Sequence, residues 1–305
     1  MKDIMDKGDN MIVREPLAEK YLIELFQIFV ENNWEIQSED DEEQSTFDMF
    51  CKRLNELDSD ADRELIMELT HKYLVVNVEE YSKYLIDVTR KFLKDNKKSI
   101  DTLDTLHIFP VQDANYLGKT KSGNLMCYLL QGCFMRRFKE FHDKRIRIIE
   151  TFDALEKYRD DIECLILIDD FIGSGDSVLE CVNLIEERGI EKDKIKAIAL
   201  VLQEQGKKAI EEYGINVYSS VLRNKAITDN YSKEEAEKKK EQMKGICKKI
   251  KANKELYLGY KESEGLVTMI KTPNNTFPFY WFEKKKEGKH TTAPFPRRNN
   301  IGVDE

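Results

Sequence analysis

The stretch from Cys164 to Glu186 constrains the fold of this chain more than any other. It reads CLILIDDFIGSGDSVLECVNLIE, and its first five residues are an apolar run that meets the acidic pair Asp169-Asp170. A glycine- and serine-rich loop over 171–177 follows the pair, and an amphipathic run begins at Val178. This order predicts a buried parallel strand, an acid-tipped loop and a helix, as in an open α/β sheet.

The loop also has the chemistry of a site for a phosphorylated sugar. Gly173 and Gly175 allow the backbone to approach a ligand closely. The hydroxyls of Ser174 and Ser177, with the free amides of the helix start, face any anion placed there. The acidic pair suits vicinal ribose hydroxyls, directly or through Mg²⁺. Ser177 and Glu180 have the spacing of a capping box that would start the helix.

These residues resemble the phosphoribosyl pyrophosphate (PRPP) motif of type I phosphoribosyltransferases, in which two acids and two apolar residues precede a phosphate loop. The resemblance implies that Asp169 and Asp170 are the catalytic pair that holds ribose and Mg²⁺. It also implies that Gly173 to Ser177 bind the 5-phosphate. Two positions depart from the motif. Asp176 stands where the family usually has Gly or Lys, and Gly173 stands where purine-salvage members carry an Asp thought to act on the base.

Composition limits the other classes of function. The net charge of −9, with 35% charged residues, argues against generic polyanion binding. The six cysteines form no CxxC pair and indicate reduced core thiols, and the four scattered histidines lack metal-site spacing. No apolar run approaches membrane-spanning length, and the N-terminus lacks a signal-peptide core. We therefore expect a soluble, cytoplasmic protein.

The chain divides into two parts by pattern. Residues 1–100 show apolar positions at helical spacing and predict an N-terminal helical region, with a boundary in the lysine-rich segment Lys94 to Asp104. Residues 101–305 predict a phosphoribosyltransferase-like domain with a parallel sheet, because strand and helix patterns alternate. The strands expected are 107–111, 146–150, 195–202 and 216–222, and the helices expected are 152–158 and 203–213.

A second loop invites comparison with the same family. The strand at 107–111 leads through a polar loop to a helix that begins near Ser122. Lys121-Ser122-Gly123 resembles a Lys-Ser-Gly of conflict-associated members at the pyrophosphate-binding loop. The resemblance implies that Lys119, Lys121 and Ser122 bind diphosphate and that Ser122 also caps the helix. An exposed helix-entry loop fits these residues equally well.

The most basic stretch is Lys233 to Lys254, with nine lysines against four glutamates. An apolar stripe through Met243, Ile246 and Ile250 predicts an amphipathic helix whose lysines cover the opposite face. A solvated face is the default interpretation. A contact with RNA is the alternative, because this patch stands out from an acidic chain.

The C-terminal part predicts a strand at 266–270, a tight loop at Asn274 and Asn275, and aromatics that form a hood or pack inside. A Pro-Asn-Asn-Thr segment and a late Phe-Pro-Arg resemble the phosphoribosyltransferase-like domain of bacterial conflict systems. The resemblance implies that Asn274 and Asn275 bind the acceptor. For Phe279 and Trp281, packing is the more common role of such residues.

Three functional hypotheses follow. The resemblance implies a Mg²⁺-dependent phosphoribosyltransferase-like effector of bacterial antiphage defence, held by protein partners in a retron-type or similar system, with RNA as a further candidate partner. The second hypothesis is a nucleotide-binding or partner-binding module without turnover, favoured by Asp176 and Gly173. The third is a methyltransferase that uses S-adenosylmethionine, because 169–175 also resembles the Asp-Pro-Phe-x-Gly-Ser-Gly loop of amino-group DNA methyltransferases. Their Asn/Asp-Pro-Pro-aromatic motif does not occur in this sequence.

Overall fold

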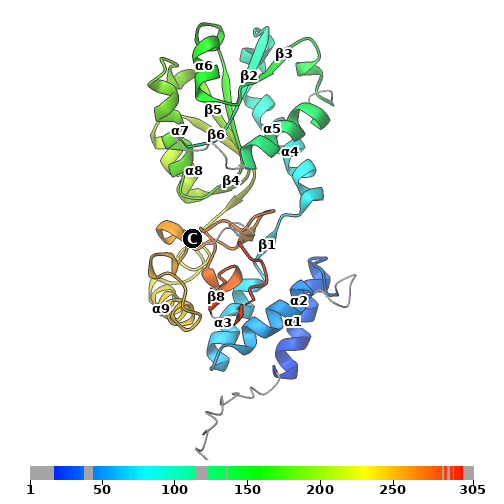
Figure 1. Cartoon of the computed structure of the whole chain (residues 1–305), viewed down its shortest axis with the longest axis vertical. Coiled ribbons are helices and arrows are strands. Elements are labelled where there is room, and N and C mark those ends of the chain that lie inside the picture. The colour runs from blue at the N-terminus through cyan, green and yellow to red at the C-terminus, as the bar shows by residue number, and fades with distance from the viewer. Residues whose placement is uncertain are drawn as a thin grey trace, which may run out of the picture.

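The computed structural model describes residues 17–37, 44–113, 122–134, 137–283, 285–286, 289–290 and 292–297. It contains a five-stranded sheet whose neighbouring strands are all parallel, in the order β3-β2-β4-β5-β6. The strands are β2 (Thr105–Pro110), β3 (Arg145–Ile148), β4 (Leu165–Ile172), β5 (Ile195–Gln203) and β6 (Asn216–Arg223). The predicted α/β class with a parallel sheet is confirmed, and Figure 1 shows this sheet in the upper lobe.

Helices cover both faces of the sheet (Figure 1). On one face lie α6 (Phe152–Tyr158), α7 (Asp176–Glu186) and α8 (Glu204–Glu212). On the other lie α4 (Val78–Asp101) and α5 (Ser122–Leu129). Because side chains on both faces are removed from water, β4 and β5 carry apolar residues along most of their length, as the sequence predicted.

The N-terminal helices form a second core with the C-terminal part of the chain. They are α1 (Glu19–Glu31), α2 (Thr46–Asn55) and α3 (Asp60–Thr70), and all three lie in the region for which the apolar spacing predicted helices. Their apolar faces pack against α9 (Lys233–Lys249) and against the 3₁₀ turn Pro278–Tyr280. Figure 1 shows these elements together in the lower lobe.

A buried arginine ties this second core together. Arg53 has no exposed surface, and its guanidinium donates to Phe279 O at 3.2 Å, to Phe282 O and to the Glu56 carboxylate at 2.9 Å. Each donation offsets part of the cost of burying the charge. Phe279 is also fully buried, and Trp281 donates its indole N–H to Thr276 O at 2.7 Å. Packing is therefore the role of these two aromatics.

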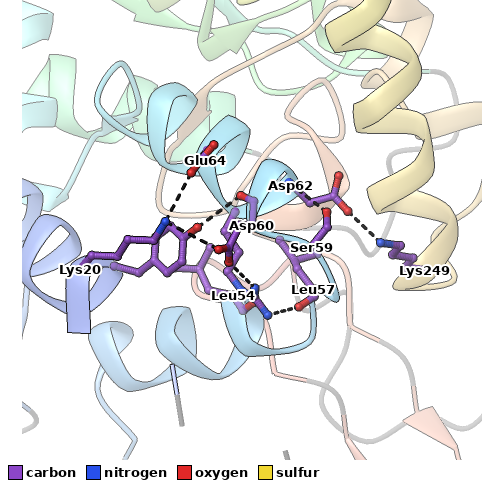
Figure 2. Close-up of polar contacts among 10 residues, drawn as sticks. Lys20, Leu54, Leu57, Ser59, Asp60, Asp62, Glu64 and Lys249 are labelled. Carbon is purple, nitrogen blue, oxygen red and sulfur yellow. Dashed lines mark hydrogen bonds and ion pairs between the residues drawn. The ribbon is translucent and has the colours of Figure 1, made fainter. Parts of the chain in front are cut away.

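The N-terminus of α3 joins three helices through charged groups, as Figure 2 shows. Ser59 caps α3, and its hydroxyl accepts from the amide of Asp62. Lys20 of α1 donates to Glu64 at 3.4 Å, and Lys249 of α9 donates to Asp62 at 2.7 Å. Acidic groups in the first turn also suit the positive end of the helix dipole. Lys20 and Lys249 reach the N-terminus of α3 from opposite sides, and the shared apolar core holds α1, α3 and α9 together.

A short parallel pair links the two cores. β1 (Leu74–Val75) pairs with β7 (Val267–Thr268), outside the main sheet. The strand predicted at 266–270 is therefore only two residues long, because its partner β1 ends where α4 is about to begin. The segment expected to be the domain boundary, Lys94 to Asp104, is the end of α4 and the turn before β2. The division at residue 100 stays a prediction.

The remaining elements are short. They are the π-helical turn Leu130–Phe134, the 3₁₀ turns Lys139–Phe141, Arg159–Asp161, Lys192–Lys194, Lys254–Leu256 and Tyr260–Glu262, and the antiparallel pair β8 (Lys285–Lys286) with β9 (Lys289–His290). Cys127, Cys164, Cys181 and Cys247 are buried free thiols, as expected, whereas the free thiol of Cys51 is half-buried. Within the described residues, no helix has both the length and the apolar character needed to span a bilayer.

Candidate functional site

The order of the strands places a crevice between β2 and β4. From β2 the chain moves outward to β3, whereas from β4 it moves the other way to β5 and β6. The connections that follow β2 and β4 therefore run apart at the carboxyl ends of these strands. Ligands of open α/β sheets bind at such a switch point. The acidic pair and the serine-rich loop both lie there, at the end of β4.

The acidic pair lies inside the strand rather than in a loop. β4 continues to Ile172, and the register pairs Phe171 with Val201 and Ile172 with Leu202 of β5. The predicted strand end before Asp169 was therefore wrong. Two apolar residues after the acids gain cross-strand neighbours on β5, which keeps the chain extended.

Each acid has a hydroxyl partner from another element. Ser122, the first residue of α5, donates to Asp169 Oδ1 at 2.6 Å, and the Asp170 amide donates to the same oxygen at 2.9 Å. Tyr81 of α4 donates to Asp170 Oδ2 at 2.6 Å and accepts from the amide of Ile270 at 3.3 Å. The structure thus brings α4 and α5 to the two carboxylates, and Tyr81 links Asp170 to the segment of Ile270.

Burial sets the electrostatics of the pair. Desolvation, followed by the neighbouring Asp170 charge, raises the pKa of Asp169 well above its usual range. Burial, followed by the Asp170 carboxylate, also raises the pKa of Tyr81, so the phenol stays a donor. Two carboxylates this close favour a proton or a cation between them, because like charges in a poorly solvated place repel.

The donors present fit Mg²⁺. The ion prefers oxygen ligands and is commonly held by one or two carboxylates together with substrate phosphates and water. Asp169 and Asp170 supply carboxylate oxygens at the crevice. Within the described part of the chain, no three or more Asp, Glu, His or Cys side chains are grouped so that they could hold a metal ion. A magnesium ion here would accordingly need oxygens of the bound substrate or of water to complete its coordination shell.

The phosphate loop is shorter than predicted, and its helix starts differently. α7 begins at Asp176 with Gly175 as its N-cap, and Gly175 has the left-handed φ of 87° with no side-chain capping bond. The capping box proposed for Ser177 and Glu180 is therefore wrong. A glycine adopts this φ without steric cost and turns the chain from β4 into α7 at once, which leaves Ser177 inside the first turn.

Both glycines of the loop lie against protein backbone or side chain. A Cβ on Gly173 would fall 2.3 Å from Cγ of Asn275, and a Cβ on Gly206 of α8 would fall 2.4 Å from the carbonyl oxygen of Gly173. Gly175 packs against Gly206 in the same way, with 3.2 Å between its added Cβ and the Gly206 carbonyl oxygen. The hydroxyl-bearing residues of the loop are more open, since Ser174 is half-buried and Ser177 is exposed.

Asn275, which was predicted to bind the acceptor substrate, thus contacts the phosphate loop directly. Its carboxamide donates to Ser263 Oγ at 3.2 Å, and its backbone oxygen accepts from the same hydroxyl at 2.9 Å. Asn275 is 7% exposed, whereas Asn274 is half-buried and accepts from the amide of Tyr260 at 2.9 Å. Of the two predicted residues, Asn275 has the contact with Gly173.

Asp176 is paired with cationic and hydroxyl groups. Lys261 donates to its carboxylate at 2.7 Å, and the Tyr260 hydroxyl donates at 3.1 Å. Partial burial acts to raise the pKa of Asp176, but these hydrogen bonds outweigh it and hold the pKa below its ordinary value. Asp176 is therefore an ionised group at the start of α7, with its charge balanced by Lys261.

Of the residues predicted to bind diphosphate, only Ser122 lies within the described part of the chain. Lys119 and Lys121 lie outside the described residues. Ser122 is described, and its hydroxyl donates to Asp169. Gly123 next to it packs closely, because a Cβ there would fall 2.9 Å from the Ile168 carbonyl oxygen. The α5 N-terminus is thereby fixed against the end of β4.

A groove of about 400 Å³ lies away from the acidic pair, along the edge strand β3. Its lining comes from α5, from the π-helical turn and from β3, and includes Tyr128, Arg145 and Glu150. Neither acid of the pair lines it. We place the candidate site at the switch point instead, because the carboxylates, the hydroxyls and the helix start converge there.

The lysines of α9 are largely paired with carboxylates. Lys239 donates to Glu68 of α3 at 2.5 Å, and Lys249 donates to Asp62. Three more pairs lie along the helix, namely Lys238–Glu234, Lys240–Glu237 and Lys244–Glu241. Balanced charges of this kind solvate and brace a helix rather than attract a polyanion.

Sequence reasoning missed two residues at the site. Tyr81 and Lys261 lie 89 and 85 positions from their partners Asp170 and Asp176. A tyrosine in a helical apolar stripe and a lysine among charged residues carry no local signal of such a role. Only the packing of α4 and of the 259–265 turn on the sheet edge reveals them.

Several known proteins are similar to this chain. A family model described as PRTase-CE matches residues 31–297. The chain belongs to the PRTase-CE family. That membership makes the chain phosphoribosyltransferase-like and decides against the methyltransferase hypothesis. A xanthine phosphoribosyltransferase of Clostridium acetobutylicum is 35% identical over 68 residues, which are 21% of this chain and 34% of that protein. The chain therefore matches only about a third of the length of this relative.

Solved structures of phosphoribosyltransferases are also similar. The orotate phosphoribosyltransferase of Aeropyrum pernix shares 12% identity over 44% of this chain and 68% of its own, with a TM-score of 0.27. The HGPRT-ase of Leishmania tarentolae, in complex with GMP, shares 16% identity over 50% of this chain and 81% of its own, with a TM-score of 0.34. Scores this low carry no separate weight, and the family model decides the assignment.

Proposed function

We propose that this PRTase-CE protein binds PRPP or a related ribose phosphate at the crevice between β2 and β4. Asp169 and Asp170 hold the ribose hydroxyls, directly or through Mg²⁺, and the loop Gly173 to Ser177 holds the 5-phosphate. The observation that carries the proposal is the convergence of a hydrogen-bonded acid pair and a helix start at the switch point of the sheet.

The test is a titration by calorimetry with PRPP, with and without Mg²⁺. We expect the wild type to bind and Asp169→Asn/Asp170→Asn to lose binding by about 100-fold or more, since two oxygen ligands lose their charge. The matched control is Asp160→Asn/Asp161→Asn, an exposed acid pair in the same lobe. Equal binding by the wild type and the site variant, or by neither, would refute the proposal.

A specific observation favours binding without turnover as the second candidate. The space beside Gly173 is filled by the neutral carboxamide of Asn275, which has no strong basicity. A group at this place could hydrogen-bond an acceptor but not remove its proton. Release of pyrophosphate from PRPP, measured with a panel of purine and pyrimidine bases, separates the two candidates. Steady release that is lost in Asp170→Asn would show a transferase, and binding alone would show a module.

The cellular setting that we propose is bacterial antiphage defence, with the protein as an effector held by protein or RNA partners. What supports it is the resemblance of the Lys-Ser-Gly and Pro-Asn-Asn-Thr segments to conflict-system members. The paired lysines of α9 leave less free positive charge for RNA than the sequence suggested. Phage plating on cells with the wild type or with Asp170→Asn tests the setting, and equal plating would contradict it.

A further inference from the structure

The turn that carries Lys261 has a fixed backbone. Lys261, Glu262 and Glu264 have left-handed φ values of 53°, 51° and 48°, which residues with side chains seldom adopt. Such a conformation persists where the surroundings determine it. The carbonyl oxygens of Lys261 and Ser263 accept from Gln205 at 3.3 Å and from Gln203 at 2.9 Å. Gln203 is the last residue of β5 and Gln205 lies in the first turn of α8, so the junction of β5 and α8 holds the turn in place.

The side chain of Lys261 is much freer than its backbone. It is 51% exposed, and its ammonium donates to Asp176 at 2.7 Å. An exposed ion pair of this kind contributes little to stability. The ammonium can consequently leave Asp176 by side-chain rotation alone, without any change in the turn.

A phosphate on the loop would compete for this ammonium. Asp176 lies between Ser174 and Ser177, and its amide lies 3.5 Å from Ser174 Oγ. A phosphate held by these residues would stand beside the Asp176 carboxylate, which repels it. A phosphate dianion carries more charge than the carboxylate and forms stronger charge-assisted hydrogen bonds.

We propose that Lys261 is a phosphate-binding residue that Asp176 holds ready, and that its ammonium moves from the carboxylate to the phosphate when a ribose phosphate binds. This inference rests on the proposed function and deepens it. It explains how a loop with an aspartate at its centre accommodates a dianion. It also assigns specificity, because a ligand without the 5-phosphate gives Lys261 no reason to leave Asp176.

The test is a double-variant cycle on the full chain, with ribose 5-phosphate as the probe in calorimetry. The variants are Lys261→Met, which keeps the aliphatic stem, Asp176→Asn, and the two combined. If Lys261 contacts the phosphate, its loss weakens binding about tenfold in the Asp176→Asn background, where the competing partner no longer carries a charge. The loss is smaller in the wild-type background, because transfer there breaks the existing pair. Lys244→Met, which breaks the 2.7 Å pair with Glu241 on α9, is the matched control and should change nothing.

The outcomes separate this inference from the proposed function. If Lys261→Met has no effect once Asp176 is Asn, Lys261 only neutralises the carboxylate, and the inference is overturned while PRPP binding stands. If the wild type binds neither PRPP nor ribose 5-phosphate, both proposals fail together. Tighter binding by Asp176→Asn that disappears when Lys261→Met is added would support the transfer.

Discussion

At the scale of single residues, the candidate site depends on groups that lie far from it in the sequence. Tyr81 contacts both Asp170 and the amide of Ile270, so one phenol joins α4, β4 and the C-terminal segment. Tyr81 has no exposed surface. A buried donor of this kind has no water to replace it, so its removal leaves the Asp170 carboxylate without this hydrogen bond.

Tyr81→Phe should lower the free energy of unfolding by about 1–3 kcal/mol, because the Asp170 carboxylate then loses a buried hydrogen bond. Urea unfolding measures the change. Tyr84→Phe is the control, since Tyr84 lies on the same helix and its hydroxyl donates no hydrogen bond within the described part of the chain. Equal stability of the two variants would mean that the Tyr81 contact contributes nothing.

His107 is a second residue with a testable consequence. It is fully buried on β2, and both ring nitrogens lack a hydrogen-bond partner among the described residues. Burial, followed by the Arg147 charge, lowers the pKa of His107 below its ordinary value. The imidazole is therefore neutral in the fold.

Burial of the neutral His107 makes the protein less stable as the pH falls. The unfolded chain binds a proton at His107 as the pH falls through about 6.5, whereas the native state does not until a lower pH. The contribution of the neutral His107 to the free energy of unfolding is thus complete above pH 6.5. Below that pH it falls, by up to about 1.4 kcal/mol per pH unit. When the free energy of unfolding is measured in urea between pH 7.5 and 5.5, His107→Leu should lose this part of its slope against pH. The exposed His142→Leu should keep it. An unchanged slope in His107→Leu would show that this histidine does not titrate as described.

At the scale of elements, the phosphate loop depends on how closely α8 approaches it. Gly206 faces the Gly173 carbonyl oxygen, and no larger residue fits between them. The loop therefore packs against α8 through Gly206 and against the side chain of Asn275. The sequence analysis identified Gly173 and Gly175 in the loop but not Gly206, against which both of them pack.

Two helical glycines allow a matched comparison. Gly206→Ala should destabilise the protein by about 1–3 kcal/mol, because the new methyl group overlaps backbone. Gly245→Ala in α9 has open space around it and should be neutral or stabilising by up to about 1 kcal/mol, since alanine is the better helix former. Thermal unfolding of both variants measures the difference. If Gly206→Ala is as stable as Gly245→Ala, the close approach of α8 is not needed.

At the scale of the whole molecule, the two cores do not follow the order of the chain. Helices α1 to α3 share a core with α9 and residues 277–280, whereas α4 covers one face of the sheet. Figure 1 shows the N-terminal helices beside the late part of the chain in the lower lobe. The parallel pair of β1 and β7 joins the cores.

This packing bears on the predicted division at residue 100. A fragment of residues 101–305 would lack α4 and leave the apolar groups beneath it exposed, and it would also lack half of the second core. We expect such a fragment to show no cooperative unfolding in urea by near-ultraviolet circular dichroism, whereas the full chain unfolds cooperatively. A cooperative transition in the fragment would instead support the predicted division.

The elements themselves were predictable because their signals are local. Apolar spacing placed α1 to α4, and unbroken apolar runs placed β4 and β5 to within a few residues. The failures had tertiary causes. The capping box at Ser177 gave way to Gly175, and β4 continued past the acids, because neighbours on other elements decide where a strand or helix ends.

By itself, the sequence determined the parallel α/β sheet and the position of the acid pair before a helix. Periodicity and glycine spacing carry that information within about 20 residues. The tertiary structure decided what surrounds the pair. It placed Ser122 on Asp169, Tyr81 on Asp170 and Lys261 on Asp176, all from distant parts of the chain. Such contacts depend on how separate elements pack at one edge of the sheet, and no local pattern encodes them.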